Sequence, residues 1–287
     1  MKKVLVLLLI VLVGGTAYAQ RGVISDWFVE VQKPNVSEVA FEDVDQATDE
    51  VEQPENEGSE QEPLTDPVVE PTAESESTLE PEAESEPESD PEAVVSTHPV
   101  EFNLAIPFTS QAPHSNWDEP YQELCEEASA LMAAAYIRGD AAGKISPDTA
   151  DAELLKLVDF ENQLFGFYKD TTAEETALLI ESYYHLTADL LENPTIEQIK
   201  SAIVAGYPVI VPAAGQQLGN PNFTGLGPPY HMFVVKGYTK DGFITNEPGT
   251  RLGADYFYTY ETVMTAMHDW NGGDVANGAK VVIIVKP

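Results

Sequence analysis

The sequence predicts an α+β domain over residues 96–287, in which a group of helices precedes an antiparallel sheet. Two observations lead to this prediction. The segment 128–135 contains only Ala, Ser, Leu and Met, so a helix there is apolar on every side and is expected to be buried. After residue 205, helical periodicity gives way to short apolar runs separated by Gly and Pro turns, which is typical of strands.

Four helices are expected in the first part of this domain. The buried one begins somewhere between Pro120 and Cys125 and ends before Gly139. The last one opens with a capping box of Thr195 and Gln198 and closes at Gly206. In order, the predicted helices run from 120–125 to 137, and over 149–160, 172–185 and 195–205.

Strands account for most of the remainder. Residues 102–107 are predicted to form an edge strand, because Pro107 cannot donate a backbone hydrogen bond. The tripeptide 240–242 makes a tight turn between two strands and so places them side by side and antiparallel. The other predicted strands are 208–212, 231–238, 243–246 and 280–285.

The first residues are typical of a secretory signal peptide. Lys2 and Lys3 precede an apolar run over 4–13, and the small-residue pattern 17–19 follows, so cleavage is expected after Ala19. An apolar run of this length is too short for a membrane anchor, which needs about 20 residues. We therefore expect export of the chain and no membrane span after cleavage.

Residues 20–95 are predicted to be a disordered acidic linker. Glu, Pro, Ser and Thr dominate it, and 22 acidic residues between Glu38 and Glu92 occur without any Lys or Arg. The formal net charge is −35 for the whole chain and −15 from Ser96 onward. Such a charge repels phosphate backbones and anionic lipid, so nucleic acid is not an expected partner.

Cys125 is the only cysteine, so an internal disulfide is impossible. It is therefore a free thiol, an intermolecular bridge, a small buried apolar residue or a nucleophile. At the start of a helix, the helix dipole would lower the thiol pKa, whereas a helix starting at Pro120 would have little effect. The histidines show no paired ligand spacing, and one Cys cannot build a zinc cluster, so no metal or cofactor is expected.

His231 is the one histidine that begins a predicted buried strand. Taken without Cys125, it is equally well a core residue with satisfied ring nitrogens. Asn246 and Glu247 end the strand antiparallel to it, where a side chain is able to orient the imidazole. Alternation along a strand sends these two side chains to opposite faces, so only one of them can serve.

Five segments together resemble papain-like cysteine peptidases, specifically the bacterial peptidase-like domains related to the bacteriocin-leader-processing peptidases. The resemblance covers about residues 101–287 and implies a papain-like fold with the Cys helix packed on an antiparallel sheet. The five segments, in order, are 106–111, 125–132, 205–211, 230–238 and 246–250.

The resemblance also implies roles for individual residues. Cys125 would attack the scissile carbonyl, His231 would take and return the proton, and Gln111 would donate to the oxyanion. The acid that orients the imidazole matches Glu247, and Asn246 is the alternative, in the amide role of papain-type sites. Glu247 is one methylene longer than the Asp usual in the family.

A second departure from the family pattern lies beside the nucleophile. Glu126 and Glu127 stand where the family usually has Gly after the Cys. Carboxylates at this place oppose ionisation of the thiol, although they suit the amino end of a helix.

These observations support an exported thiol hydrolase of peptide or amide bonds, with protein, peptide or cell-wall peptide as substrate. The alternative is a non-catalytic binding or adhesion module on a degenerate papain-like scaffold. In that case residues 216–223 and the aromatic residues Tyr256, Phe257, Tyr258 and Trp270 would line a ligand groove. A hydrogen bond between Cys125 and His231 would favour the enzyme.

Overall fold

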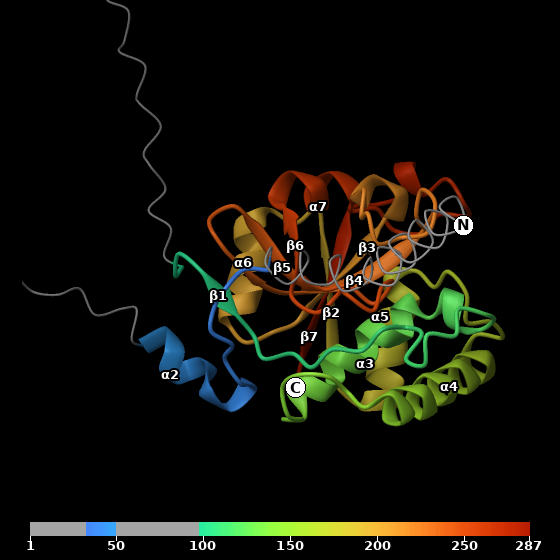
Figure 1. The fold of residues 1–287 in the computed structure, drawn as a ribbon, viewed down its shortest axis with the longest axis horizontal. Helices are drawn as coiled ribbons and strands as arrows, with labels where there is room; N and C mark the ends of the chain where they lie inside the picture. Colours follow the sequence, from blue (N-terminus) through green and yellow to red (C-terminus); the bar gives the residue numbers. More distant parts are fainter. Residues whose placement is uncertain (1–32, 50–97) are drawn as a thin grey trace, which may run out of the picture.

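The computed structural model describes residues 33–49 and 98–287, and these form one seven-stranded sheet with helices packed around it (Figure 1). The predicted signal peptide 1–19 and most of the predicted linker lie outside the described residues. The strand order is β2-β7-β3-β4-β5-β6, and β1 pairs with β4 off this path. The strands are β1 Phe102–Asn103, β2 Thr187–Glu192, β3 Val209–Ala213, β4 His231–Tyr238, β5 Gly242–Asn246, β6 Tyr256–Thr259 and β7 Val281–Lys286.

The helices lie mainly before and between the strands in sequence. In Figure 1, α3 and α4 lie below the strands and α7 lies above them. The helices are α2 Val44–Asp49, α3 Cys125–Ile137, α4 Pro147–Leu164, α5 Ala173–Leu179, α6 Ile196–Val204 and α7 Tyr260–Ala266. Short 3-10 turns are η1 Phe41–Asp43, η2 Tyr121–Glu123, η4 Gly215–Leu218 and η5 Val275–Asn277, and η3 Ile180–Tyr184 is a π-helical turn.

The predicted α+β class is confirmed, since all pairings between these strands are antiparallel. Strand β4 is buried along its whole length and lies between β3 and β5. It carries a bulge between Val235 and Gly237. Gly237 is required there, because a Cβ would lie 2.5 Å from the carbonyl oxygen of Phe102 on β1.

Helix α3 is the buried helix that the sequence predicts. All thirteen of its residues are buried, and it packs on β4. Small side chains such as Ala130 and Ala133 let the helix backbone approach the sheet closely. The helix begins at Cys125 and not at Pro120, because residues 121–123 form the separate turn η2. Cys125 is therefore the first helical residue.

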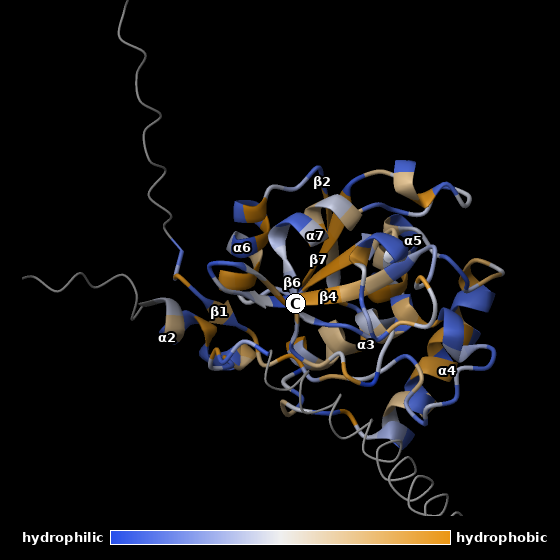
Figure 2. Cartoon of the chain, turned by 45° about the horizontal axis from the view of Figure 1, so that its top comes forward, coloured by the Kyte–Doolittle hydropathy of each residue, from blue (hydrophilic) through white to orange (hydrophobic). Residues whose placement is uncertain are grey.

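The hydropathy colouring in Figure 2 follows this layering. Strands β4 and β7 are orange at the centre of the molecule, and α4 shows a blue outer side. Its inward residues Leu154 and Leu157 are fully buried against α3. Among the helices of the described residues, none combines the length and the apolar character needed to cross a membrane.

Two predicted elements differ from the structure, and β2 was not predicted. The edge strand expected over 102–107 is limited to β1, because the residues that follow pair only through an isolated bridge between Leu104 and Val39. The helix expected over 172–185 is α-helical only to Leu179, continues as a π-helical turn and ends at His185 in a left-handed conformation. Strand β2 was expected neither as strand nor as helix, because most of its side chains are exposed and only its pairing with β7 defines it.

Residues 33–49, which we call the N-terminal strap, pack on the domain although they lie within the predicted linker. Val39 forms a parallel bridge with Leu104, and Val44 is buried beside Gly206. Lys236 on β4 is buried and pairs with Glu38 of the strap and with Asp255. The prediction of a disordered linker is therefore wrong over this segment, where a few apolar side chains find partners in the fold.

Candidate active site

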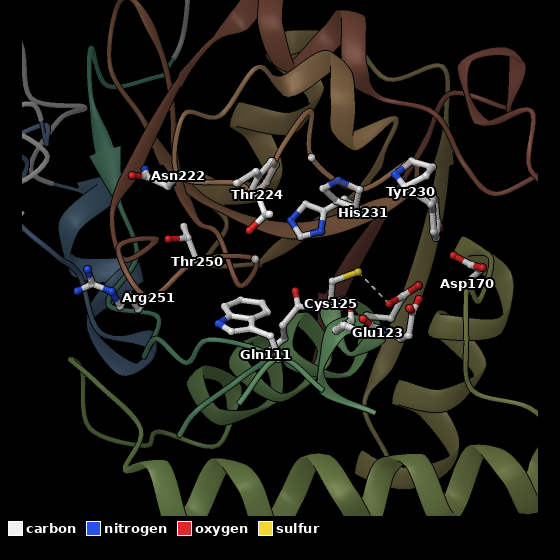
Figure 3. A pocket seen from close by; sticks show the side chains of 18 of the residues that line it. Gln111, Glu123, Cys125, Asp170, Asn222, Thr224, Tyr230, His231, Thr250 and Arg251 are labelled. Carbon is white, nitrogen blue, oxygen red and sulfur yellow. Dashed lines mark hydrogen bonds between the residues drawn. The ribbon is translucent and has the colours of Figure 1, made fainter. Parts of the chain in front are cut away.

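A cavity of about 590 Å³ opens between the amino end of α3 and the start of β4 (Figure 3). Three of the predicted site residues, Gln111, Cys125 and His231, line it. Aromatic side chains form much of its wall, namely those of Trp117, Phe223, Tyr230 and Trp270. The fold therefore brings together residues that are more than a hundred positions apart in the sequence.

His231 is the first residue of β4, and its imidazole bonds the carboxylate of Glu247 directly after β5. Nε2 lies 2.5 Å from Oε1, and both side chains are almost completely buried. Glu247 is held in turn by the hydroxyl of Tyr258, which donates to Oε2 at 3.0 Å, and by the backbone N–H of Gly249, which donates to Oε1 at 2.8 Å. The imidazole is thus fixed in orientation, with Nδ1 as its remaining nitrogen.

Asn246 faces away from His231, as alternation along the strand requires. Its Nδ2 donates to the backbone carbonyl of Ile106 at 3.0 Å and to that of Pro107 at 3.3 Å. Of the two candidates for the third residue, Glu247 is the one that contacts the imidazole. Asn246 instead anchors the segment that follows β1.

Cys125 is 6% exposed and is the first residue of α3. The thiol donates to Oε2 of Glu126 at 3.0 Å, the contact drawn as a dashed line in Figure 3. Within the described part of the chain, no hydrogen bond joins Cys125 to His231. The two residues face the same cavity without being paired.

The pKa of the Cys125 thiol is shifted upward, whereas the position at a helix start was expected to lower it. Burial raises the pKa of Cys125 well above its usual value, and the charge of Glu126 and the hydrogen bond to it raise the pKa further. A backbone N–H from Met232 acts in the other direction. The predicted lowering by the helix dipole is outweighed, since desolvation and an adjacent carboxylate both disfavour the thiolate.

Glu126 and Glu127 are themselves buried carboxyl groups. Burial is the largest cause that raises the pKa of each, and neighbouring carboxyls raise both further. Glu127 faces Glu161 of α4, whose pKa burial also raises. Among the described residues, no other group donates a hydrogen bond to the four carboxyl oxygens of Glu127 and Glu161. The two carboxyl groups can therefore bond each other only when one of them is protonated.

Gln111 does not have the geometry of an oxyanion donor. Its Nε2 donates to the backbone carbonyls of Tyr121 and Gln122, both at 3.0 Å, so both amide protons already have acceptors. Its Oε1 is buried and has no hydrogen-bond partner among the described residues. The side chain therefore ties the turn before α3 to the segment that follows β1.

Sequence reasoning missed the part that Tyr258 plays. The alternation of the run 256–260 favours a strand, and the sequence offered Tyr258 only as a residue of a ligand groove. In the structure the Tyr258 hydroxyl donates to Glu247 and accepts a hydrogen bond from Nδ2 of Asn220 at 2.8 Å. Of the four aromatic residues proposed for a groove, Trp270 lines the cavity. A buried tyrosine at an inward position of a strand needs a hydrogen-bond acceptor for its hydroxyl, and this is the sequence signal that points to a polar partner such as Glu247.

Residues 103–272 match the Peptidase C39 like family. The chain belongs to this family. The predicted resemblance to papain-like cysteine peptidases is thereby confirmed, and the α+β architecture is that of a C39-like, papain-like fold. Strand β7 lies beyond the matched residues and completes the sheet of the C39-like domain between β2 and β3.

Among solved structures, the C39-like domain is similar to a crystal structure described as a C39-like peptidase from Bacillus anthracis. The two chains are 18% identical, the match covers 65% of this chain and 98% of that chain, and the TM-score is 0.42. The search of curated proteins gives no match to the chain.

Proposed function

We propose that this chain is an exported cysteine peptidase, or a related amide hydrolase, with Cys125 as nucleophile, His231 as general base and acid, and Glu247 as the residue that orients the imidazole. One observation carries the proposal. His231, which is paired with the buried Glu247, lines the same cavity as a cysteine at the amino end of a buried helix. Membership of a peptidase-like family supports a protein or peptide as substrate.

The reaction follows from this arrangement. Nδ1 of His231 takes the proton from Sγ of Cys125, and the sulfur attacks the carbonyl carbon of the substrate. The imidazolium, held by Glu247, then gives its proton to the leaving amine, which departs from a thioester on Cys125. Water activated by Nδ1 cleaves the thioester, releases the acid and returns the proton to sulfur.

The developing oxyanion needs donors other than Gln111. The backbone N–H of Cys125 stands at the first position of α3, and no acceptor in the described residues bonds it. A carbonyl oxygen of a substrate bound to Sγ lies beside this N–H and within the positive end of the helix dipole. We propose this N–H as the main oxyanion donor.

Export is proposed on the sequence alone. A signal peptide over 1–19 places the domain outside the cytoplasm, where peptide substrates include those of the cell wall. The strongly negative charge of the chain favours substrates that are neutral or cationic over polyanions. Cell-wall peptide and extracellular protein are therefore the substrate classes to test first.

Hydrolysis tests this function. The mature chain is incubated with a mixed peptide library, casein and cell-wall stem peptides, and products are followed by mass spectrometry. We expect cleavage by the wild type, and none by Cys125→Ala or His231→Ala. His114→Ala is the matched control, because His114 is half exposed beside Asp148 and outside the cavity lining, and it should cleave at the wild-type rate. Cleavage that survives Cys125→Ala would contradict the proposal.

One observation favours the second candidate, a non-catalytic binding module. The thiol bonds Glu126, and the amide of Gln111 is occupied, so neither is set for catalysis. In that case peptides that contact the cavity would bind without being cleaved, and Cys125→Ala would leave their Kd unchanged.

A further inference from the structure

Glu126 directly follows the nucleophile on α3 and contacts it. Glu126 lines the cavity and is 1% exposed. Its Oε2 accepts a hydrogen bond from the thiol, and the distance from Sγ to Oε2 is 3.0 Å. A hydrogen bond in a buried place of low dielectric is stronger than the same bond in water. The contact therefore stabilises one orientation of the Cys125 side chain.

This contact competes with the one that catalysis requires. The thiol has one proton, and it can donate that proton to one acceptor at a time. Glu247 occupies Nε2 of His231, which leaves Nδ1 as the acceptor for the thiol. While Sγ donates to Glu126, the proton is not transferred to His231.

Burial raises the pKa of Glu126, and no positive charge among the described groups around it compensates its ionised form. Among the described residues, Glu126 interacts electrostatically with the thiol of Cys125 and with four acids or phenols, namely Glu127, Glu161, Asp170 and Tyr230. None of these is a cation. A carboxylate in this setting opposes the formation of a second negative charge on the adjacent sulfur.

We propose that Glu126 is the resting partner of the nucleophile, which keeps the Cys125 thiol protonated and bonded to the Glu126 carboxyl group in place of His231 until the contact is released. The inference rests on the proposed function for its consequence, the control of hydrolysis. On release, Sγ turns to Nδ1, its S–H bond breaks as an N–H bond forms on the imidazole, and a thiolate and an imidazolium result. No proton enters or leaves the site in this step.

The experiment compares the rate of Cys125 alkylation by iodoacetamide from pH 6 to 11 in the full mature chain, a range that extends upward because the pKa of Cys125 is raised. Glu126→Gln keeps the shape of the side chain and removes the carboxylate that the wild type forms once the pH exceeds the raised pKa of Glu126. We therefore expect the midpoint of the pH profile to fall by about one unit or more. This corresponds to an alkylation rate that is about tenfold higher, or more, at a pH between the pKa of Glu126 and the wild-type midpoint.

Glu127→Gln is the matched control. Glu127 is the next residue on the same helix and is equally buried, but it faces Glu161 and does not bond the sulfur. Its substitution should move the midpoint by much less. An unchanged or higher midpoint in Glu126→Gln, or an equal shift in both variants, would overturn the inference.

Folding is followed by thermal melts of each variant. If Glu126→Gln does not fold, Glu126→Asp replaces it, because Asp keeps the charge but withdraws it from Sγ by one methylene. Its midpoint should then also lie below that of the wild type, and an unshifted midpoint would overturn the inference.

Peptide hydrolysis measured on the same samples separates the two proposals. If the wild type hydrolyses no peptide while Glu126→Gln lowers the midpoint, the proposed function fails and the resting contact stands. If the wild type hydrolyses peptides while Glu126→Gln leaves the midpoint unchanged, the resting contact alone fails.

Discussion

Nε2 of His231 lies 2.5 Å from Oε1 of Glu247, across two adjacent antiparallel strands and away from solvent. This hydrogen bond occupies Nε2, so Nδ1 is the ring nitrogen that is free to act in the cavity. A carboxylate that receives two further hydrogen bonds, from Tyr258 and Gly249, is a rigid acceptor. The site therefore has a fixed imidazole and a cysteine that has to turn toward it.

Substitution of Glu247 tests the orienting role. Glu247→Ala leaves Nε2 without its acceptor, and we expect kcat/KM for a cleaved peptide to fall on the order of 10²- to 10⁴-fold, as when a triad loses its acid. Glu247→Gln keeps an acceptor oxygen and should retain more activity. Equal kcat/KM for the wild type and Glu247→Ala would show that the pair does not serve catalysis.

Asn246 is predicted to contribute to stability and not to chemistry. Asn246→Ala leaves the carbonyl oxygens of Ile106 and Pro107 without a buried donor, so the free energy of unfolding should fall by about 1–3 kcal/mol. Urea unfolding measures this loss. The pH profile of Cys125 alkylation should not change, and a shifted profile would return Asn246 to the candidates for the third residue.

Gln111 is expected to act on the turn before α3. Gln111→Ala removes both hydrogen bonds to the carbonyls of Tyr121 and Gln122, which should lower the free energy of unfolding by about 1–3 kcal/mol. A normal unfolding curve together with a kcat reduced on the order of 10²-fold or more would instead identify an oxyanion donor.

The buried carboxyl pair makes stability depend on pH. Burial raises the pKa of Glu127 and of Glu161 in the folded state, so the folded protein holds protons that the unfolded chain loses above about pH 4.3. Unfolding free energy should therefore be highest below that pH and fall as the pH rises toward the folded-state values, by at most about 1.4 kcal/mol per pH unit and group.

Urea unfolding between pH 4 and 8 measures this slope. In Glu161→Gln the slope should be smaller, because one of the two buried acids no longer titrates. Asp159→Asn is the control, since Asp159 is exposed on the same helix. A stability that rises with pH over this range in the wild type, or a slope equal in wild type and Glu161→Gln, would contradict the interpretation.

The N-terminal strap is predicted to stabilise the domain. Val44 is 5% exposed, and Val44→Ala should lower the free energy of unfolding by about 1–3 kcal/mol through the lost burial and the cavity that remains. Val100→Ala is the control, because Val100 is 76% exposed. Equal unfolding curves for the two variants would show that the strap does not hold the domain together.

Local sequence patterns predicted the elements that carry the site. The small apolar residues of α3 identified a buried helix, and the run 231–238 matched β4 at both ends, because each pattern follows from burial on all sides. The capping box of Thr195 and Gln198 was also predicted correctly, because it depends only on two residues three positions apart in the sequence.

Other features depend on tertiary partners and were not predictable from the sequence. Alternation placed Asn246 and Glu247 on opposite faces but did not say which face meets His231. The strap contains too few apolar residues to be distinguished from a linker until Val39 and Val44 meet the domain. The bond from Cys125 to Glu126 depends on the side-chain orientation of the nucleophile, which no local pattern determines.

The central claim is that Cys125 is a nucleophile served by His231. Acylation by p-nitrophenyl acetate tests it without knowledge of the substrate, through a burst of p-nitrophenol and the intact mass of the protein. The account predicts one acetyl group per chain, located on Cys125, formed much more slowly in His231→Ala and at the wild-type rate in His114→Ala. An acetyl group absent from Cys125, or acylation equally fast in His231→Ala, would contradict it.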